Sequence, residues 1–241
     1  FYFNNWRIAF FLASIPGFIL VYYVLKLKDV GHNKTEEKIS FKQVLKNKIF
    51  LWIVFSGTLV SFAAGAFITW GVEFINRYAG YNLRDAGIVL GVGMMVASVV
   101  GVLCGSHFAD YLHKKHKWGR SLVVAVSLIS SAPLMYLGLV AENNVLFLGL
   151  FFTGAMLLAV YLGPVTAVIH DIVPKQYRAG AFGFYAFFIH LVGESFAPAI
   201  VGHISDLYDL RTGLVFATGF IFLGGIAFLP VVYLIYKKSL Q

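Results

Sequence analysis

The stretch KDVGHNKTEEKISFKQVLKNK, residues 28–48, divides the sequence into two unequal parts. It is long and charged, and Phe41 is its only aromatic residue. One long apolar run precedes it, and six follow it with short polar connections between them. We interpret it as a surface linker that ends in a short amphipathic stretch before the second run. The sequence therefore predicts one helix, residues 1–27, a linker, residues 28–47, and a six-helix unit, residues 48–241.

The composition indicates a protein that faces lipid. Of the 241 residues, 59% are hydrophobic, 17% are aromatic and 12% are charged, whereas a soluble domain carries roughly 25% charged residues. The net charge of +8 could suggest nucleic acid, but the basic residues lie in short clusters between apolar runs, which fits membrane topology better. We expect an integral membrane protein whose partner is the bilayer, and no nucleic-acid partner.

Seven apolar segments are long enough to span a bilayer, which takes about 20 residues each. We place them at about residues 6–27, 48–76, 85–109, 119–140, 145–170, 180–205 and 212–236. The fold class is therefore all-α, a polytopic transmembrane helix bundle.

The loops differ sharply in charge, and this orients the spans. Fifteen of the 19 Lys and Arg residues fall on one side of the membrane, and the other four are Arg7, Arg77, Arg84 and Arg211. The positive-inside rule places the first side, and with it the C-terminus, in the cytoplasm. Seven spans also suit a receptor or a structural membrane protein, but the long basic loop after the first span favours one helix plus a six-helix unit.

The loop GSHFADYLHKKHKWGR, residues 105–120, combines an acidic residue at a helix end with a basic run. Asp110 can pair with Lys114, Lys115 or Arg120, and with an adjacent helix end. Such a charge latch can break when a bundle rocks between two states. The alternative is a solvated, positive-inside loop, and the spacing leaves both open.

This loop resembles the signature G-x-x-x-D-R-x-G-R-[KR] of the major facilitator superfamily. Asp110 aligns, but Ser106 stands at the glycine position and Tyr111 replaces the first arginine. Residues 6–20 resemble the sixth helix of the Spinster-like branch, with its W-R-x-x-F and P-G elements. Residues 161–206 resemble the tenth and eleventh helices of that branch, with matches at Gly163-Pro164, Ala167, Ile169, Val173-Pro174, Arg178-Ala179, Ala181, His190-Leu191, Gly193-Glu194, Pro198, Gly202 and Ser205-Asp206.

The resemblance implies the sixth helix and the C-terminal six-helix half of a transporter with about twelve helices, whose N-terminal helices are missing here. It implies alternating access, by secondary active or facilitated transport, for a lysolipid or sphingoid-like amphiphile. A small organic anion or organophosphate is the alternative substrate. We expect the cytoplasmic membrane of a bacterium as the location.

An enzyme is not expected, because the sequence has no Walker A, HExxH or GxSxG motif and no clustered carboxylates. A single cysteine, Cys104, leaves no CxxC motif. We therefore expect no catalytic residues, no cofactor and no metal site.

The candidate substrate or proton-coupling residues begin with His190 and Glu194 in FFIHLVGESFAP, residues 187–198. They are four residues apart, so they share a helical face, and they fall near the middle of a span. A charge there costs roughly 2.5–3.5 kcal/mol on insertion scales, so the pair should face the bundle interior or a wet cavity. A hydrogen bond that pins two helices, a titrating or substrate-contacting site, and lipid exposure all remain open.

The second span adds three candidates near its outer end. Thr69 and Trp70 could contact substrate, whereas Glu73 could equally be an interfacial carboxylate paired with Arg77.

Two prolines should kink the fifth and sixth spans of the seven. Pro164 follows Gly163 near a cytoplasmic helix end, and Pro198 lies late in its span. Each removes a backbone hydrogen bond. A gating kink and an inert bend are both possible.

Overall fold

The computed structural model describes residues 6–26 and 41–240, and these ranges contain helices and turns but no strand. The chain divides into two compact units, Phe1–Ile39 and Ser40–Gln241. The described part of the first unit is α1, Trp6–Leu25, which contains Pro16. Its apolar stretch Phe10–Leu25 falls on the first expected span. Most of the expected linker, residues 28–47, lies outside the described residues, so the proposed domain boundaries stay a prediction.

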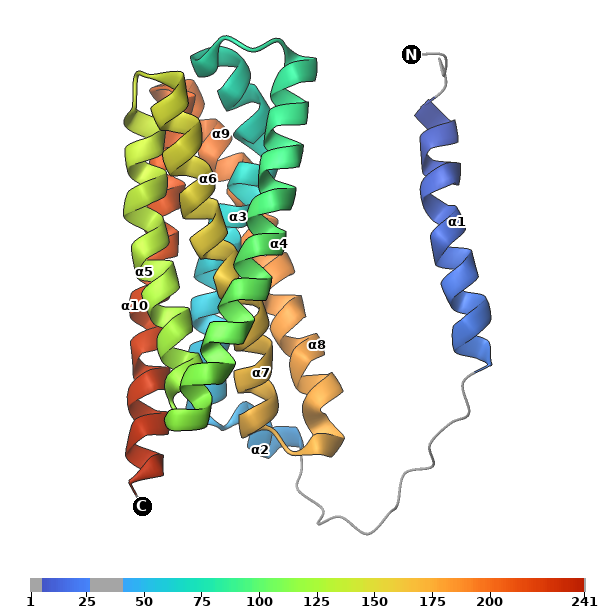
Figure 1. Ribbon diagram of the computed structural model, residues 1–241, viewed down its shortest axis with the longest axis vertical. Coiled ribbons are helices and arrows are strands. Elements are labelled where there is room, and N and C mark those ends of the chain that lie inside the picture. The colour runs from blue at the N-terminus through green and yellow to red at the C-terminus, as the bar shows by residue number, and fades with distance from the viewer. Residues whose placement is uncertain (1–5, 27–40, 241) are drawn as a thin grey trace. The chain divides into compact units, whose positions relative to one another are not determined.

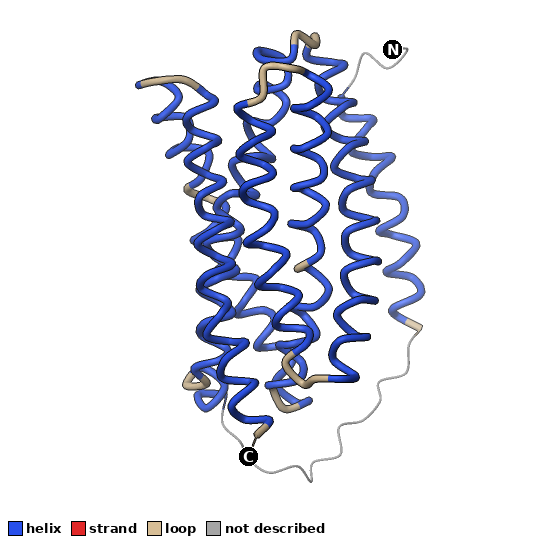
Figure 2. The backbone as a smooth tube through the Cα atoms, turned by 60° about the vertical axis from the view of Figure 1, so that its left-hand side comes forward, coloured by secondary structure: helices blue, strands red, loops and turns tan. Residues whose placement is uncertain are grey.

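The second unit is a bundle of long helices that run roughly antiparallel to one another (Figures 1 and 2). Six of its helical stretches are long and apolar enough to cross a membrane, which confirms the predicted polytopic all-α fold. Its elements are α2 (Phe41–Leu45), α3 (Lys48–Ala79), α4 (Leu83–Lys115), α5 (Gly119–Val140), α6 (Asn144–Val160), α7 (Leu162–Ile172), η1 (Lys175–Tyr177), α8 (Arg178–Phe188), η2 (Ile189–Glu194), α9 (Ala197–Leu207) and α10 (Leu210–Ser239).

Capping residues in the short connections fix where the helices begin. Asn47, Asn82 and Asn143 each accept a backbone N–H of the helix that follows, and Asp209 does the same for α10. A side chain of this kind satisfies one of the N–H groups that a helix start leaves without a partner. α3 ends at Gly80, whose φ of 75° lies in the left-handed region that favours glycine.

Burial is uneven across the six spans. In the most apolar window of each span, 61% of the residues are buried in α3 and 56% in α5, but only 17% are buried in α4 and 22% in the span from η1 to α9. The core lies between α3, α5 and α10, where aromatic pairs such as Phe62–Phe220, with ring centroids 4.2 Å apart, pack together. Large faces of α4 and of the α8–α9 span are therefore left uncovered by the rest of the second unit.

Two spans are interrupted partway along, as the tube of the backbone shows (Figure 2). α6 gives way to α7 at Tyr161, three residues before Pro164. The other span changes from α8 to the π-helix η2, and α9 then starts with Pro198 in its first turn. A proline ring clashes with the carbonyl four residues earlier, so both breaks lie just before the prolines. The kinks expected at Pro164 and Pro198 thus take the form of breaks, and the π-helix had not been predicted.

Candidate functional site

A hydrogen bond across η2 joins the side chains of His190 and Glu194. The distance from His190 Nδ1 to Glu194 Oε2 is 2.7 Å. The side chain of His190 is 63% exposed and that of Glu194 is 32% exposed. The pair therefore lies on the surface of the second unit, not in the interior of its six-helix bundle. We call these two residues the polar pair.

Glycines bring the backbone of η2 directly against α3. A Cβ atom added at Gly65 would lie 2.8 Å from the carbonyl oxygen and 2.9 Å from the Cα of Glu194. A Cβ atom added at Gly193 would lie 2.7 Å from the carbonyl oxygen of Thr58. Small residues at such positions let two helices approach closely in lipid. The polar pair is consequently held by backbone packing rather than by long side chains.

Three hydroxyl groups lie behind the polar pair, and the sequence had not indicated them. Tyr161 lies near Tyr185, Ser61 and Glu194, and in the described part of the chain the buried Tyr185 hydroxyl has no hydrogen-bond partner. All three hydroxyl-bearing residues are buried. Tyr161 occupies the break between α6 and α7. A tyrosine two residues before Gly163-Pro164 was the one available signal, and the two broken spans meet at this buried cluster.

The hydroxyl of Ser195 forms a hydrogen bond at the end of η2, the helix that carries the polar pair. Its Oγ donates to the backbone carbonyl of His190 at 2.8 Å, and its backbone N–H donates to the same oxygen at 3.1 Å. The second bond has the i to i+5 pattern of a π-helix. Ser195, the residue directly after this short π segment, thus closes it with both its side chain and its backbone N–H.

Of the three candidates on the second expected span, one links two helices, one is exposed and one pairs within its own helix. Trp70 Nε1 donates to the carbonyl of Pro198 at 3.0 Å. A Cβ atom added at Gly202 would lie 2.9 Å from the ring of Trp70. Trp70 therefore links α3 to α9. Thr69 is exposed. Glu73 pairs with Arg77 on its own helix, with a distance of 2.6 Å from Arg77 Nε to Glu73 Oε1.

Charged side chains join three helices at the basic end of the bundle. Arg120 on α5 donates from Nε and Nη2 to Asp110 Oδ1 on α4, both at 2.8 Å. Its Nη1 donates to Asp171 Oδ2 on α7 at 2.7 Å. We call this group the Asp110–Arg120–Asp171 clamp. Lys115 instead donates to the hydroxyl of Tyr111 at 2.7 Å.

The clamp partly matches the latch expected from the sequence. Asp110 and Arg120 come together, and Lys114 lines a small cavity beside them. Asp171 had been missed as a partner, because a contact between residues 51 positions apart depends on how α5 and α7 pack. In the described ranges, no group of three His, Cys, Asp or Glu side chains could hold a metal ion.

Six membrane-length helices, two of them interrupted partway along, define a polytopic helical membrane protein. Residues 108–239 match the Major Facilitator Superfamily, and residues 26–143 match the Organic Anion Transporter Polypeptide (OATP) family. The chain belongs to the major facilitator superfamily.

Similar proteins confirm the resemblance to the Spinster branch. The chain is 30% identical over 223 residues to Protein spinster of Drosophila melanogaster, covering 84% of this chain and 36% of the relative. It is 28% identical over 213 residues to an MFS-type efflux pump of Mycolicibacterium smegmatis, covering 84% and 48%. It is 25% identical over 223 residues to the sphingosine-1-phosphate transporter SPNS2 of Danio rerio, covering 83% and 44%.

A solved structure shares the fold. It is the crystal structure of a bacterial homolog to the human lysosomal transporter Spinster, in an inward-facing and unoccupied conformation. The match has a TM-score of 0.74 at 15% sequence identity and covers 97% of this chain and 60% of the other. The chain thus spans less than half the length of the three relatives named above.

Proposed function

We propose that this chain is the last helix of an N-terminal half and the whole C-terminal half of an alternating-access transporter, and that its substrate is a lysolipid or a sphingoid-like amphiphile. The observation that carries the proposal is the polar pair, which is hydrogen-bonded and exposed in the middle of an otherwise apolar span. Transport is secondary active or facilitated.

The cost of exposing charge to lipid supports a wet, substrate-accessible location for the pair. An ionisable side chain at the bilayer centre costs roughly 2.5–3.5 kcal/mol on insertion scales. His190 is exposed, so hydrocarbon is an unfavourable surrounding for it. A cavity completed by further helices of the transporter would remove this cost. The pair would then face that cavity.

The surface around the pair suits an amphiphile. Phe187 and Leu191 are 57% and 49% exposed, and at spacings of three and four they share a helical face with His190 and Glu194. A charged head group could contact the pair while an apolar tail lies along the neighbouring aromatic and aliphatic side chains. Relatives described as a sphingosine-1-phosphate transporter and as a probable sphingolipid transporter agree with this substrate class.

The clamp and the broken spans supply the parts that a rocking motion needs. The Asp110–Arg120–Asp171 clamp holds α4, α5 and α7 together at one end. Exposed ion pairs are individually weak, so the clamp can open and close at little cost. We propose it as a gating latch and the breaks before Pro164 and Pro198 as bends that the cycle uses.

An organic anion or organophosphate is the second candidate substrate. The match of residues 26–143 to the Organic Anion Transporter Polypeptide family and the net charge of +8 favour it. A receptor or structural role has no comparable support among the relatives.

We place the protein in the cytoplasmic membrane of a bacterium, with its C-terminus in the cytoplasm. The uneven distribution of Lys and Arg supports the orientation. The Mycolicibacterium relative and the bacterial solved structure support the source.

Uptake into proteoliposomes tests the substrate class. We expect a labelled lysophospholipid to enter, an excess of unlabelled lysophospholipid to compete, and a sugar phosphate to leave uptake unchanged. Strong competition by the sugar phosphate and none by the lysolipid would replace our choice with the organophosphate.

A further inference from the structure

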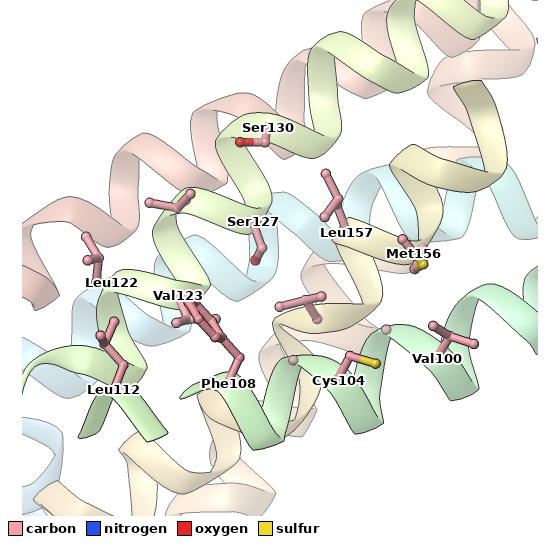
Figure 3. A pocket seen from close by; sticks show the side chains of 14 residues that line it. Val100, Cys104, Phe108, Leu112, Leu122, Val123, Ser127, Ser130, Met156 and Leu157 are labelled. Atoms are coloured by element: carbon pink, nitrogen blue, oxygen red, sulfur yellow. The ribbon is translucent and has the colours of Figure 1, made fainter. Parts of the chain in front are cut away.

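A long apolar groove runs between α4 and α5 and has α6 as its floor (Figure 3). Its volume is about 510 Å³. Its two walls include Val100, Cys104, Phe108 and Leu112 of α4 and Leu122 and Val126 of α5. None of the residues that line it belongs to the polar pair or to the hydroxyl cluster behind the pair. We call it the α4–α5 groove.

The groove exists because α4 and α5 are held apart along most of their length by α6. A Cβ atom added at Gly101 would overlap the carbonyl oxygen of Met156, and one at Gly105 would lie 2.8 Å from the Cα of Val160. α4 therefore packs backbone to backbone on α6, while the face of α4 that carries Cys104 and Phe108 stays open; Phe108 is 56% exposed.

The dimensions of the groove match one leaflet of a bilayer. Val100 and Leu112, at its two ends on α4, are twelve residues apart, which is about 18 Å at 1.5 Å per residue. The hydrocarbon core of a bilayer is about 30 Å thick, so one leaflet contributes about 15 Å. An acyl chain that enters beside Leu112 would reach Val100 near the bilayer centre.

The mouth of the groove is basic. One turn beyond Leu112, α4 ends at Lys115, and the loop to α5 contains Lys117 and Trp118. The nearby carboxylate, Asp110, already accepts two hydrogen bonds from Arg120. Lys115 donates one bond to Tyr111, which leaves two of its three donors for a ligand. The charge at the mouth thus favours an anionic head group, and Trp118 is a residue type enriched at that depth.

We propose that the α4–α5 groove binds an acidic phospholipid of the surrounding membrane, with an acyl chain along Cys104 and Phe108 and the phosphate at Lys115 and Lys117. This lipid is resident and is not the transported substrate. Its site joins α4 to α5 beside the Asp110–Arg120–Asp171 clamp, so it would hold together the same two helices that the clamp joins.

Native mass spectrometry of the protein in detergent, with equal amounts of phosphatidylglycerol and phosphatidylcholine, tests the site. We expect one retained phosphatidylglycerol, in at least about fivefold excess over phosphatidylcholine, because each basic residue near a membrane surface contributes an attraction of that size. Cys104→Trp fills the groove and should abolish retention. Leu103→Trp places the same bulk on an exposed position of α4 outside the groove and should leave retention unchanged.

Two further variants separate the tail from the head group. Val126→Trp fills the groove from the other wall. Loss of lipid retention in both Cys104→Trp and Val126→Trp, with unchanged melting temperatures, excludes misfolding as the cause. Lys115→Gln combined with Lys117→Gln should keep one lipid but remove the fivefold preference. Equal retention of both lipids by the unchanged protein, or phosphatidylglycerol still bound to Cys104→Trp, would overturn the proposal. Displacement of the retained phosphatidylglycerol by lysophosphatidylglycerol at one tenth of its concentration would overturn the proposal too, since the groove would then be a substrate path.

Discussion

Glu194 combines a partly exposed carboxylate with a backbone that is packed against another helix. Its carboxylate accepts a hydrogen bond from His190 Nδ1, while its carbonyl and Cα lie against the Gly65 position of α3. A proton-coupling residue needs a protonation state that depends on the conformation around it, so the role of Glu194 is tested by removing its charge.

The first prediction concerns Glu194→Gln, which keeps the shape of the side chain and removes its charge. If Glu194 carries the coupling proton, the variant should bind substrate nearly normally and lose the pH dependence of uptake. If it binds a cationic head group, substrate binding itself should weaken. The measurement is uptake against pH, together with substrate binding in detergent.

His190→Asn is the matched variant on the other member of the polar pair. A purely structural pair would lower the melting temperature in both variants and leave transport per folded molecule nearly normal. That pattern would remove His190 and Glu194 from the functional site.

The second prediction concerns Asp209, the N-cap of α10, which lies outside the spans. Its Oδ1 accepts from the backbone N–H of Thr212 at 2.6 Å, and this bond lowers the pKa of the carboxyl. A lowered folded-state pKa stabilises the protein above the carboxyl's ordinary range, near 3.9, and the stabilisation is lost as the pH falls through the folded-state pKa.

Thermal unfolding between pH 7 and pH 3 checks this. The melting temperature of the unchanged protein should fall further between pH 7 and pH 3 than that of Asp209→Asn. The amide oxygen of that variant still caps the helix, but the amide does not titrate in this range. Equal losses in the two proteins would show that the charge of Asp209 contributes nothing measurable to stability.

At the scale of helices, glycine positions decide how closely α3 and η2 approach. The third prediction is that Gly65→Ala destabilises the protein by about 1–3 kcal/mol, the usual cost of inserting atoms into a packed contact, because its Cβ atom would overlap the backbone of Glu194. Thermal denaturation in detergent measures the loss.

Gly91→Ala in α4 is the matched control. Nothing lies within 4 Å of its added Cβ atom, and alanine favours a helix over glycine by about 0.5–1 kcal/mol. The control should leave stability unchanged or raise it. A similar loss in both variants would mean that close packing of α3 on η2 is not what Gly65 provides.

The fourth prediction concerns the clamp as a link between helices. Arg120→Gln should lower stability by about 1 kcal/mol or less per broken ion pair, because the two carboxylates are 54% and 41% exposed and surface pairs contribute little. The loss of stability in the double variant Arg120→Gln/Asp171→Asn should be smaller than the sum of the losses in the two single variants. Strict additivity in this double-mutant cycle would show that the two residues do not interact.

At the scale of the whole chain, apolar runs predicted the fold well because a spanning segment in lipid must be long, apolar and helical. The spacing of His190 and Glu194 likewise placed them on one helical face. The sequence could not reveal η2, since a change of one residue in register is decided by packing on α3. It could not reveal Asp171 in the clamp for a related reason, because that contact joins distant segments.

The fifth prediction tests the proposed orientation of the whole chain. In a Cys104→Ala background, Lys115→Cys should react with a membrane-impermeant maleimide only after the cytoplasmic side is made accessible. Arg84→Cys, in a loop on the other side, should react in intact cells. Labelling of Lys115→Cys from outside, with none of Arg84→Cys, would reverse the topology.

The π-helix also makes the length of this span critical. A π segment can be regarded as an α-helix with one residue inserted, and the insertion turns everything that follows by about 100°. Deleting a single residue between Ile189 and Glu194 would therefore rotate α9 back by that angle. Gly202 and the carbonyl of Pro198 would turn away from Trp70, which now contacts both. A family member that lacks one residue here would have to join α3 and α9 through different side chains, so a one-residue gap at this point of an alignment would mark a different site.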